Sequence, residues 1–155
     1  MSEKLNLLEQ EGDVAADYLE GILDIADFDG DIDMDVENGR AVVSIVGAEL
    51  SQLVGEKGKV LDALQELTRL AVTRETGERS RLMLDISGYR EQVRAELTEL
   101  GNETAAKVLA SGEPIKLRVM SSFERKVVHD AVSAAGAKSV SEGETPNRRI
   151  VVHPA

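Results

Sequence analysis

The sequence predicts an α+β protein, and three patterns carry that prediction. Apolar residues recur at helical spacing over residues 11–26 and again over 59–73, whereas over 31–36 they alternate with aspartates. The dipeptide Asn38-Gly39 then separates two strand-like segments, and it is a strong short-range signal for a β-hairpin. Helices and strands therefore follow one another along the chain and must share a core.

The first half of the chain divides into six elements. The order α-β-β-α-α-β is the one expected of a type II KH fold, a module that binds single-stranded nucleic acid. Its core should be aliphatic, because the chain has no Trp, two Tyr and two Phe. In order, the expected elements are helix 11–26, strands 31–36 and 41–46, helices 49–54 and 59–73, and strand 81–87.

A long helical pattern begins near Tyr89 and connects this half to a smaller one. Gly101-Asn102 is a candidate bend or break within the helix, and the Ser-Gly-Glu-Pro segment 111–114 should end it. We expect three parts: residues 1–88 as an acidic N-terminal helix and KH-like domain, 89–112 as a connecting helix, and 113–155 as a small domain.

The C-terminal part predicts the order β-α-β-β. Residues 115–119 alternate as a strand, and Ser121 with Glu124 forms a capping-box pattern that opens a helix. Gly136 should end this helix, and segments 138–143 and 148–152 should pair as a hairpin. His153 should lie on unstructured surface. The helix residues expected to face inward are Phe123, Val127, Val128, Ala131 and Ala135.

Charge is distributed unevenly along the chain. The net charge is −11, but residues 1–54 hold 14 acidic and two basic residues, a net of −12, whereas residues 55–155 carry a net of +1. Contact with phosphates depends on local cations rather than on global charge. The acidic segment is either a solvated surface or a shield or partner site, and a polyanion should bind the second part.

Composition argues against several classes of protein. With no Cys and two His, thiolate metal sites, disulfides and a His-built zinc site are excluded. The few aromatic residues argue against an RRM, which stacks bases on exposed rings. The aspartates at 27–35 lack the Gly and Glu that a calcium loop requires, and no catalytic motif is found. No apolar run is long enough for a membrane span or a signal peptide, so a cytoplasmic protein without cofactor is expected.

The tetrapeptide Gly55-Glu56-Lys57-Gly58 is the first candidate site. Two glycines would let a phosphate approach backbone N–H groups at the start of the next helix, whose dipole favours an anion. Lys57 and Lys59 add positive charge, and Glu56 opposes it. The alternative interpretation is a helix-turn-helix in which the glycines only permit the turn.

The second candidate site is Arg125-x-x-x-His129, with Lys126 beside it. Residues four apart are neighbours on a helix, so Arg125 and His129 should lie together on an exposed face. Arg offers a planar fork for phosphate, and Arg148 and Arg149 could bring further cations to the same face. The alternative is a solvated helix face without function.

These segments together resemble the bacterial Jag family, the SpoIIIJ-associated proteins, which join a KH domain to an R-three-H domain. The resemblance lies in residues 53–65, 123–129 and 141–152, and it extends over roughly 30–153. Many members carry a separate N-terminal domain, and the resemblance leads us to expect a member that lacks it. The resemblance implies RNA binding in the cytoplasm and links to division, envelope synthesis or sporulation. It also suggests a small KH-protein partner and an association with a membrane insertase.

We therefore expect a single-stranded RNA-binding protein, a post-transcriptional regulator rather than an enzyme, with no small-molecule substrate. Single-stranded DNA is an alternative ligand. The alternative function is a protein-interaction adaptor for the insertase or the cell-envelope machinery. The residues expected to contact RNA are Gly55, Glu56, Lys57, Gly58, Lys59, Arg125, Lys126, His129, Arg148 and Arg149.

Overall fold

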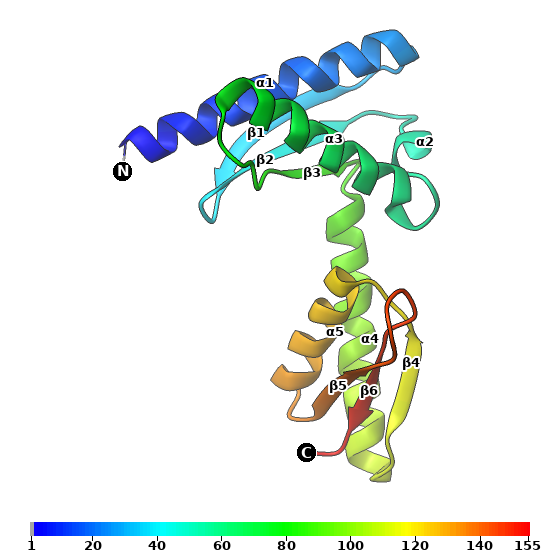
Figure 1. The fold of residues 1–155 in the computed structure, drawn as a ribbon. Coiled ribbons are helices and arrows are strands. Elements are labelled where there is room, and N and C mark those ends of the chain that lie inside the picture. Colours follow the sequence, from blue (N-terminus) through cyan, green and yellow to red (C-terminus); the bar gives the residue numbers. More distant parts are fainter. Residues whose placement is uncertain (1) are drawn as a thin grey trace. The chain divides into compact units, whose positions relative to one another are not determined.

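A computed structural model describes residues 2–155, which form two compact units (Figure 1). The first unit ends at Arg90, and the second comprises Glu91–Ala155. The elements of the first unit are α1 (Ser2–Ala26), β1 (Asp31–Glu37), β2 (Arg40–Val46), α2 (Ser51–Val54), the 3₁₀ turn η1 (Glu56–Gly58), α3 (Lys59–Thr76) and β3 (Met83–Ile86).

The first unit contains a three-stranded sheet in the order β1-β2-β3. The β1 and β2 strands are antiparallel around Asn38 and Gly39, whose φ angles of 52° and 73° are those of a tight hairpin turn. The β2 and β3 strands are parallel, so the chain must cross over between them, and α2 and α3 make this crossover. The observed order of elements is the order expected from the sequence.

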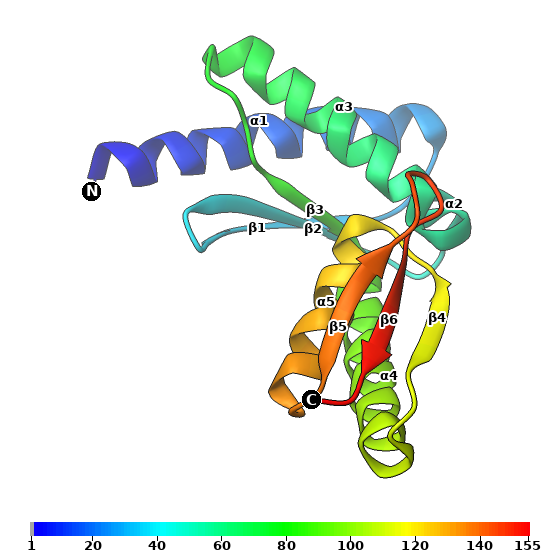
Figure 2. The same cartoon turned by 60° about the horizontal axis from the view of Figure 1, so that its bottom comes forward.

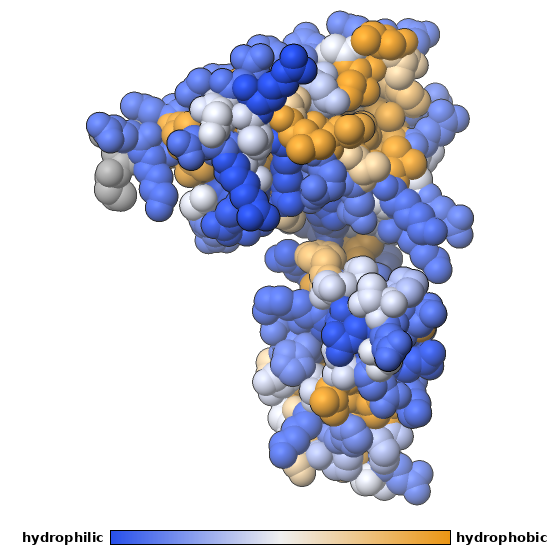
Figure 3. Space-filling model, viewed as in Figure 1, coloured by the Kyte–Doolittle hydropathy of each residue, from blue (hydrophilic) through white to orange (hydrophobic). Residues whose placement is uncertain are grey.

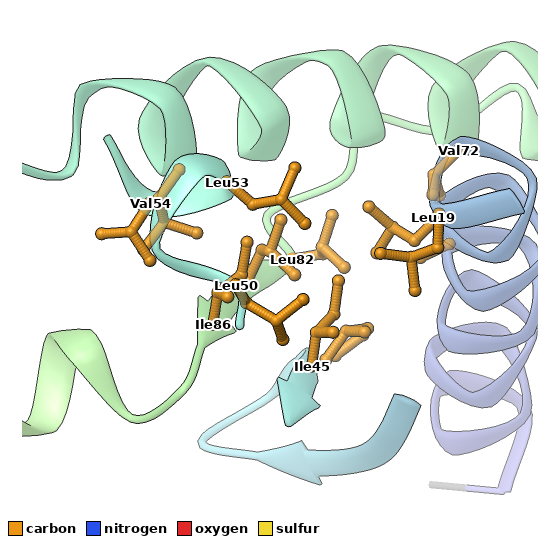
Figure 4. Packing of buried hydrophobic residues seen from close by; sticks show 14 residues of the cluster. Leu19, Ile45, Leu50, Leu53, Val54, Val72, Leu82 and Ile86 are labelled. Atoms are coloured by element: carbon orange, nitrogen blue, oxygen red, sulfur yellow. The ribbon is translucent and has the colours of Figure 1, made fainter. Parts of the chain in front are cut away.

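Alternation along β2 places one row of side chains in the core of the first unit. Val43 and Ile45 are fully buried, and they pack with Leu19 of α1 and Val72 of α3 (Figure 4). Both helices therefore cover the same face of the sheet (Figure 1). The core is aliphatic, as the composition predicts, with Tyr18 and other partly buried residues at its margin.

Helix α1 begins nine residues earlier than expected. Its first turns carry exposed polar residues such as Glu3 and Asn6, and their leucines, Leu5 and Leu8, line a surface groove rather than the core. The helix α2 is shorter than the expected 49–54. Leu5 and Leu8 continue the helical spacing of Ala15 and Leu19, so the expected start of α1 at residue 11 was too late.

The second unit packs two helices on one face of an antiparallel sheet in the order β4-β6-β5 (Figure 2). Val108, Val128 and Val132 are fully buried, and they pack with Ile150 and Val152 of the central strand. Its elements are α4 (Tyr89–Ser111), β4 (Ile115–Val119), α5 (Ser122–Ala134), β5 (Lys138–Glu142) and β6 (Arg149–His153).

Gly101 does not interrupt α4, although the sequence made it a candidate break. Instead it is buried where α5 comes close: a Cβ at this position would lie 2.8 Å from the Cβ of Ala131 and 3.1 Å from the Val128 carbonyl oxygen. The glycine is needed for the close approach of two helices rather than for a turn. The C-terminal end of α4 falls at Ser111, as expected.

The structure confirms the capping signals of α5 and corrects two other expectations. Ser121 accepts a hydrogen bond from the Glu124 N–H, and the Glu124 carboxylate accepts one from the Ser121 N–H. Ala135, expected inward, is exposed because the helix has ended, and Val132 is buried instead. His153, expected on unstructured surface, is the last residue of β6, where it pairs with Lys138.

Exposed apolar side chains follow α3. Val60, Leu67 and Leu70 are 40%, 48% and 66% exposed, and orange surface lies over this helix in Figure 3. They alternate with charged residues along the helix, including Asp62 and Glu66. Within residues 2–155, no helix is both long and apolar enough to cross a membrane.

Candidate nucleic-acid interface

The Gly55–Lys59 segment makes a sharp turn between α2 and α3. Of the four residues Gly55–Gly58, three have a positive φ angle: 74° at Gly55, 55° at Lys57 and 74° at Gly58. The Gly55 N–H donates to the Ser51 carbonyl at 3.0 Å, and the Gly58 N–H donates to the Gly55 carbonyl at 3.3 Å. A left-handed conformation at a lysine is uncommon, and here the neighbouring hydrogen bonds maintain it.

Both glycines are also required by packing. A Cβ at Gly55 would lie 2.4 Å from Cγ2 of Val60, and one at Gly58 would lie 2.7 Å from Cε2 of Tyr89. Gly58 is itself buried. The space freed by the missing side chains is therefore occupied by the protein, and the backbone of the turn is held against α3 and the start of α4.

The charged side chains of this turn point into solvent. Glu56, Lys57 and Lys59 are exposed, and within the described residues neither lysine forms an ion pair. Gly58 is the N-cap of α3 and supplies no side-chain cap, and the Lys59 N–H already donates to the Glu56 carbonyl. The N-terminus of α3 therefore keeps its positive dipole end without a side-chain cap. The turn thus presents two cations and a helix N-terminus together.

Arg90 stabilises this region and could not be found from the sequence. Its Nε donates to the Leu84 carbonyl at 2.7 Å, and its Nη2 lies 3.1 Å from the Asp62 carboxylate and 3.2 Å from Gln65 Oε1. Asp62 lies in the first turn of α3, so Arg90 neutralises a carboxylate that follows the Gly55–Lys59 turn along the chain. Tyr89 and Arg90 belong to a helical pattern about 30 residues later, and no local signal connects them with the turn.

Arg125 is fixed by hydrogen bonds, contrary to the expectation of an exposed cation. Its Nη1 donates to Ser141 Oγ at 3.0 Å, its Nη2 to Ser122 Oγ at 3.1 Å, and its Nε to the Met120 carbonyl at 3.4 Å. The side chain is partly buried. It connects the start of α5 to β5, so it contributes to the fold of the second unit.

His129 makes the same kind of connection one helical turn later. Its Nδ1 forms a short hydrogen bond with Ser139 Oγ, although the residue as a whole is exposed. Four residues rise about 6 Å along a helix, and two residues span about 6.6 Å along a strand. The Arg125 and His129 spacing therefore matches Ser141 and Ser139 on β5, which runs antiparallel to the helix.

The remaining cations of the second unit lie in different surroundings. Lys126 forms an exposed ion pair with Asp130 at 3.0 Å. Arg148 donates through Nη2 to the Ser141 carbonyl at 3.4 Å, next to Arg125, and its buried Nε has no partner among the described residues. Arg149 lies in the ladder between Val119 and Glu142, on the sheet face opposite the core, because Ile150 points inward.

The structure thus brings together some of the expected residues and separates others. Gly55 to Lys59 form one turn in the first unit, with Glu56, Lys57 and Lys59 exposed and Gly58 buried. Arg125, His129 and Arg148 gather around two serines of β5 in the second unit. Arg149 does not join them, and Lys126 points outward with its own counter-ion. Ser139 and Ser141 are two residues apart on β5 and therefore lie on the same face of the strand. The sequence contains this spacing, but the Arg-x-x-x-His motif concerns the helix alone and does not point to it.

Comparison with known sequences bears on both units. Residues 95–154 match the R-three-H domain family. A protein from Bacillus subtilis named RNA-binding protein KhpB is 34% identical over 128 residues, which cover 79% of this chain and 62% of that protein. The protein of the same name from Lactiplantibacillus plantarum is 31% identical over 137 residues, 88% of this chain and 42% of that protein.

A third relative, RNA-binding protein KhpB of Clostridium symbiosum, is 29% identical over 143 residues, 90% of this chain and 64% of that protein. This chain therefore spans between 42% and 64% of the length of these curated relatives. The match to the R-three-H family agrees with the β-α-β-β order of the second unit. The chain carries an R-three-H domain over residues 95–154 and is similar over most of its length, as its sequence suggested, to the KhpB proteins.

Proposed function

We propose that this protein binds single-stranded RNA through two surfaces, the Gly55–Lys59 turn and the Arg125/His129 helix. The observation that carries the proposal is the turn itself. Two lysines that form no ion pair with any described residue lie there beside a helix N-terminus without a side-chain cap, in a chain with a net charge of −11. The names of the relatives support RNA as the ligand.

In this proposal the first unit acts as a type II KH domain. A phosphate would accept hydrogen bonds from the first-turn amides of α3, and Lys57 and Lys59 would neutralise its charge. The close packing of Gly55 on Val60 and of Gly58 on Tyr89 supports a preformed turn, which lowers the entropy lost on binding. Glu56 would limit affinity by repulsion.

The second unit would extend the contact along the strand. The Arg125 guanidinium and the His129 ring are held in place by serines, so they are oriented before RNA arrives. Arg148 adds a second guanidinium near Ser141, and no carboxylate pairs with either arginine within residues 2–155. Two unpaired guanidinium groups at one place are suited to a phosphate.

We infer further that the protein is a cytoplasmic binding protein rather than an enzyme. The name that the relatives share, RNA-binding protein, supports a binding role. Single-stranded DNA remains an alternative ligand, and the expected small KH-protein partner is a separate proposal. A binding titration with matched RNA and DNA oligonucleotides distinguishes the two nucleic acids.

The test is a charge reversal on the turn. Lys57→Asp keeps a residue type that tolerates positive φ, and it should weaken binding of a fluorescently labelled RNA of about 20 nucleotides at least tenfold in an anisotropy titration. Lys57→Asn removes the charge only and should give an intermediate loss. Lys107→Asp is the matched control, because Lys107 is exposed on α4 and the change in net charge is identical. Equal losses for Lys57→Asp and Lys107→Asp would refute the assignment of the turn.

A further inference from the structure

A groove lies between the N-terminal part of α1 and the edge of β1. Its volume is about 430 Å³, and its apolar lining comes from Leu5 and Leu8 on the helix and from Met34 and Val36 on the strand. Leu5 is 46% exposed and Met34 is 48% exposed. Gly12 completes the floor, since a Cβ there would contact the Met34 sulfur at 3.6 Å.

The groove borders an unpaired strand edge. In the sheet order β1-β2-β3, one side of β1 has no neighbouring strand. A two-residue hairpin makes Glu37 and Arg40 a hydrogen-bonded pair, so the odd-numbered residues of β1 bond to β2. The backbone groups of Ile32, Met34 and Val36 therefore point outward. Consistent with this, the Val36 N–H donates to the carboxylate of the adjacent Asp35 at 2.7 Å.

Carboxylates surround this edge on both sides. Glu9 and Asp13 line the groove on the helix side, and the odd-numbered positions of β1 carry acidic residues on the face away from the helices. Within the described residues none of these carboxylates forms an ion pair. The acidic residues in question are Glu9, Asp13, Asp31, Asp33, Asp35 and Glu37.

This charge pattern decides what can occupy the edge. Alternating acidic residues protect an edge strand against pairing with neutral or acidic strands, including β1 of a second copy. They also repel the phosphates of RNA. A basic strand is instead attracted, and alternation in such a strand would place apolar side chains over the groove and cations beside the aspartates.

We propose that the free edge of β1 binds an extended, basic segment of a partner protein, in which lysines or arginines alternate with apolar residues. The segment adds a fourth strand to the sheet next to β1. Its backbone pairs with Ile32, Met34 and Val36, its apolar side chains contact Leu5 and Met34, and its cations pair with Asp33 and Asp35. This surface is separate from the Gly55–Lys59 turn, and its role does not depend on RNA binding.

The probe is a fluorescein-labelled peptide of nine residues with the sequence SKVKVKVKS, added to the whole chain after RNase treatment and removal of RNA. The control peptide SKKKKVVVS has the same composition and charge but no alternation. We expect saturable binding of the alternating peptide in an anisotropy titration and binding at least tenfold weaker for the control peptide. Hydrogen exchange at the Met34 and Val36 amides should slow on binding.

Three protein variants distinguish the contribution of the acidic side chains to peptide binding from that of the apolar groove. Asp33→Lys with Asp35→Lys should weaken peptide binding at least tenfold, whereas Glu20→Lys with Asp24→Lys, the same charge change on an exposed part of α1, should have little effect. Met34→Thr keeps strand propensity and should weaken binding about threefold to tenfold through the lost apolar contact. Each variant should retain its RNA affinity, so failure here is distinguishable from failure of the RNA proposal.

Three results would overturn the proposal. Equal binding of the two peptides would show that the surface attracts any polycation, and an unchanged affinity in the Asp33→Lys, Asp35→Lys variant would place the peptide elsewhere. Sedimentation of the chain alone tests the other occupant: a dimer at micromolar concentration that prevents peptide binding would show that a second copy covers β1.

Discussion

The Gly55–Lys59 turn and the Arg125/His129 helix present cations in opposite ways. In the turn, the backbone is held rigidly by Val60 and Tyr89, while Lys57 and Lys59 extend freely into solvent. In the helix, the backbone is regular and the side chains themselves are held, Arg125 by three hydrogen bonds and His129 by one. One site is rigid in its main chain, and the other is rigid in its side chains.

This difference separates stability from binding at the two sites. Removing a cation from the turn should leave the fold intact, because no protein group depends on it. Removing Arg125 leaves the oxygens of Ser141, Ser122 and Met120 without their donor, so it should affect folding as well as binding. The following predictions test this contrast, from the largest expected change in stability to the smallest.

Gly58→Ala should destabilise the first unit most, by about 3 kcal/mol, through backbone strain and the clash with Tyr89. Urea unfolding followed by circular dichroism measures the loss. Gly77→Ala is the matched control, because Gly77 has a φ of 76° but nothing within 4 Å of its added Cβ. The control should lose only about 1–2 kcal/mol, the cost of the left-handed conformation. Equal losses would show that Tyr89 does not restrict the turn.

Arg125→Ala should destabilise the second unit by about 2 kcal/mol, since hydrogen bonds from a charged donor to partly buried oxygens are lost. The neighbouring Lys126→Ala should cost less than about 0.5 kcal/mol, because its ion pair with Asp130 is exposed. Adding Ser141→Ala to Arg125→Ala should cost less than the sum of the single changes. Additive losses would mean that the two side chains do not interact in solution.

His129→Ala should cost about 1 kcal/mol, less than Arg125→Ala, because a single hydrogen bond to Ser139 is lost from an exposed residue. Ser139→Ala should produce a loss of similar size, and the double variant should be no worse than either single variant. Thermal unfolding of the four proteins measures these differences. An unchanged stability of the His129→Ala variant would show that the hydrogen bond between His129 and Ser139 does not stabilise the contact between α5 and β5.

Lys57→Ala should leave the stability unchanged within about 0.5 kcal/mol while weakening RNA binding. Each phosphate contact on a single strand contributes a slope of about −0.7 to the plot of log K against log salt concentration, so the slope should become shallower by about that amount. A titration series at several salt concentrations provides the measurement. Lower affinity with an unchanged slope would place Lys57 outside the phosphate contacts.

The contrast also explains how far the sequence could predict the structure. Asn38-Gly39, the Ser121/Glu124 capping box and Gly136 act on residues within a few positions of themselves, and each is found where its local chemistry requires it. Element order follows from the periodicity of apolar residues, which reports contact with the core. The early turns of α1 lie beyond the core, and their leucines, Leu5 and Leu8, continue the periodicity along a surface groove instead.

The surroundings of the candidate site residues could not be predicted in the same way. Exposure of Lys57 follows from the turn, but the burial of Gly58 depends on Tyr89, which lies far along the sequence. Likewise, the fixation of Arg125 depends on Ser141 in a strand of another element. Helical spacing predicted correctly that Arg125 and His129 share a face. It could not predict what that face would contact, because tertiary packing decides this.

The contact between Tyr89 and Gly58 also provides a built-in spectroscopic reporter. The chain has no Trp and two tyrosines, of which Tyr18 lies at the margin of the aliphatic core in α1. Incorporation of 3-fluorotyrosine should therefore give two ¹⁹F resonances, and Tyr18→Phe would assign them. The resonance of Tyr89 comes from a ring within contact distance of the turn, so its chemical shift and line width would follow occupancy of the turn during a titration. No label needs to be attached to the surface whose binding is measured.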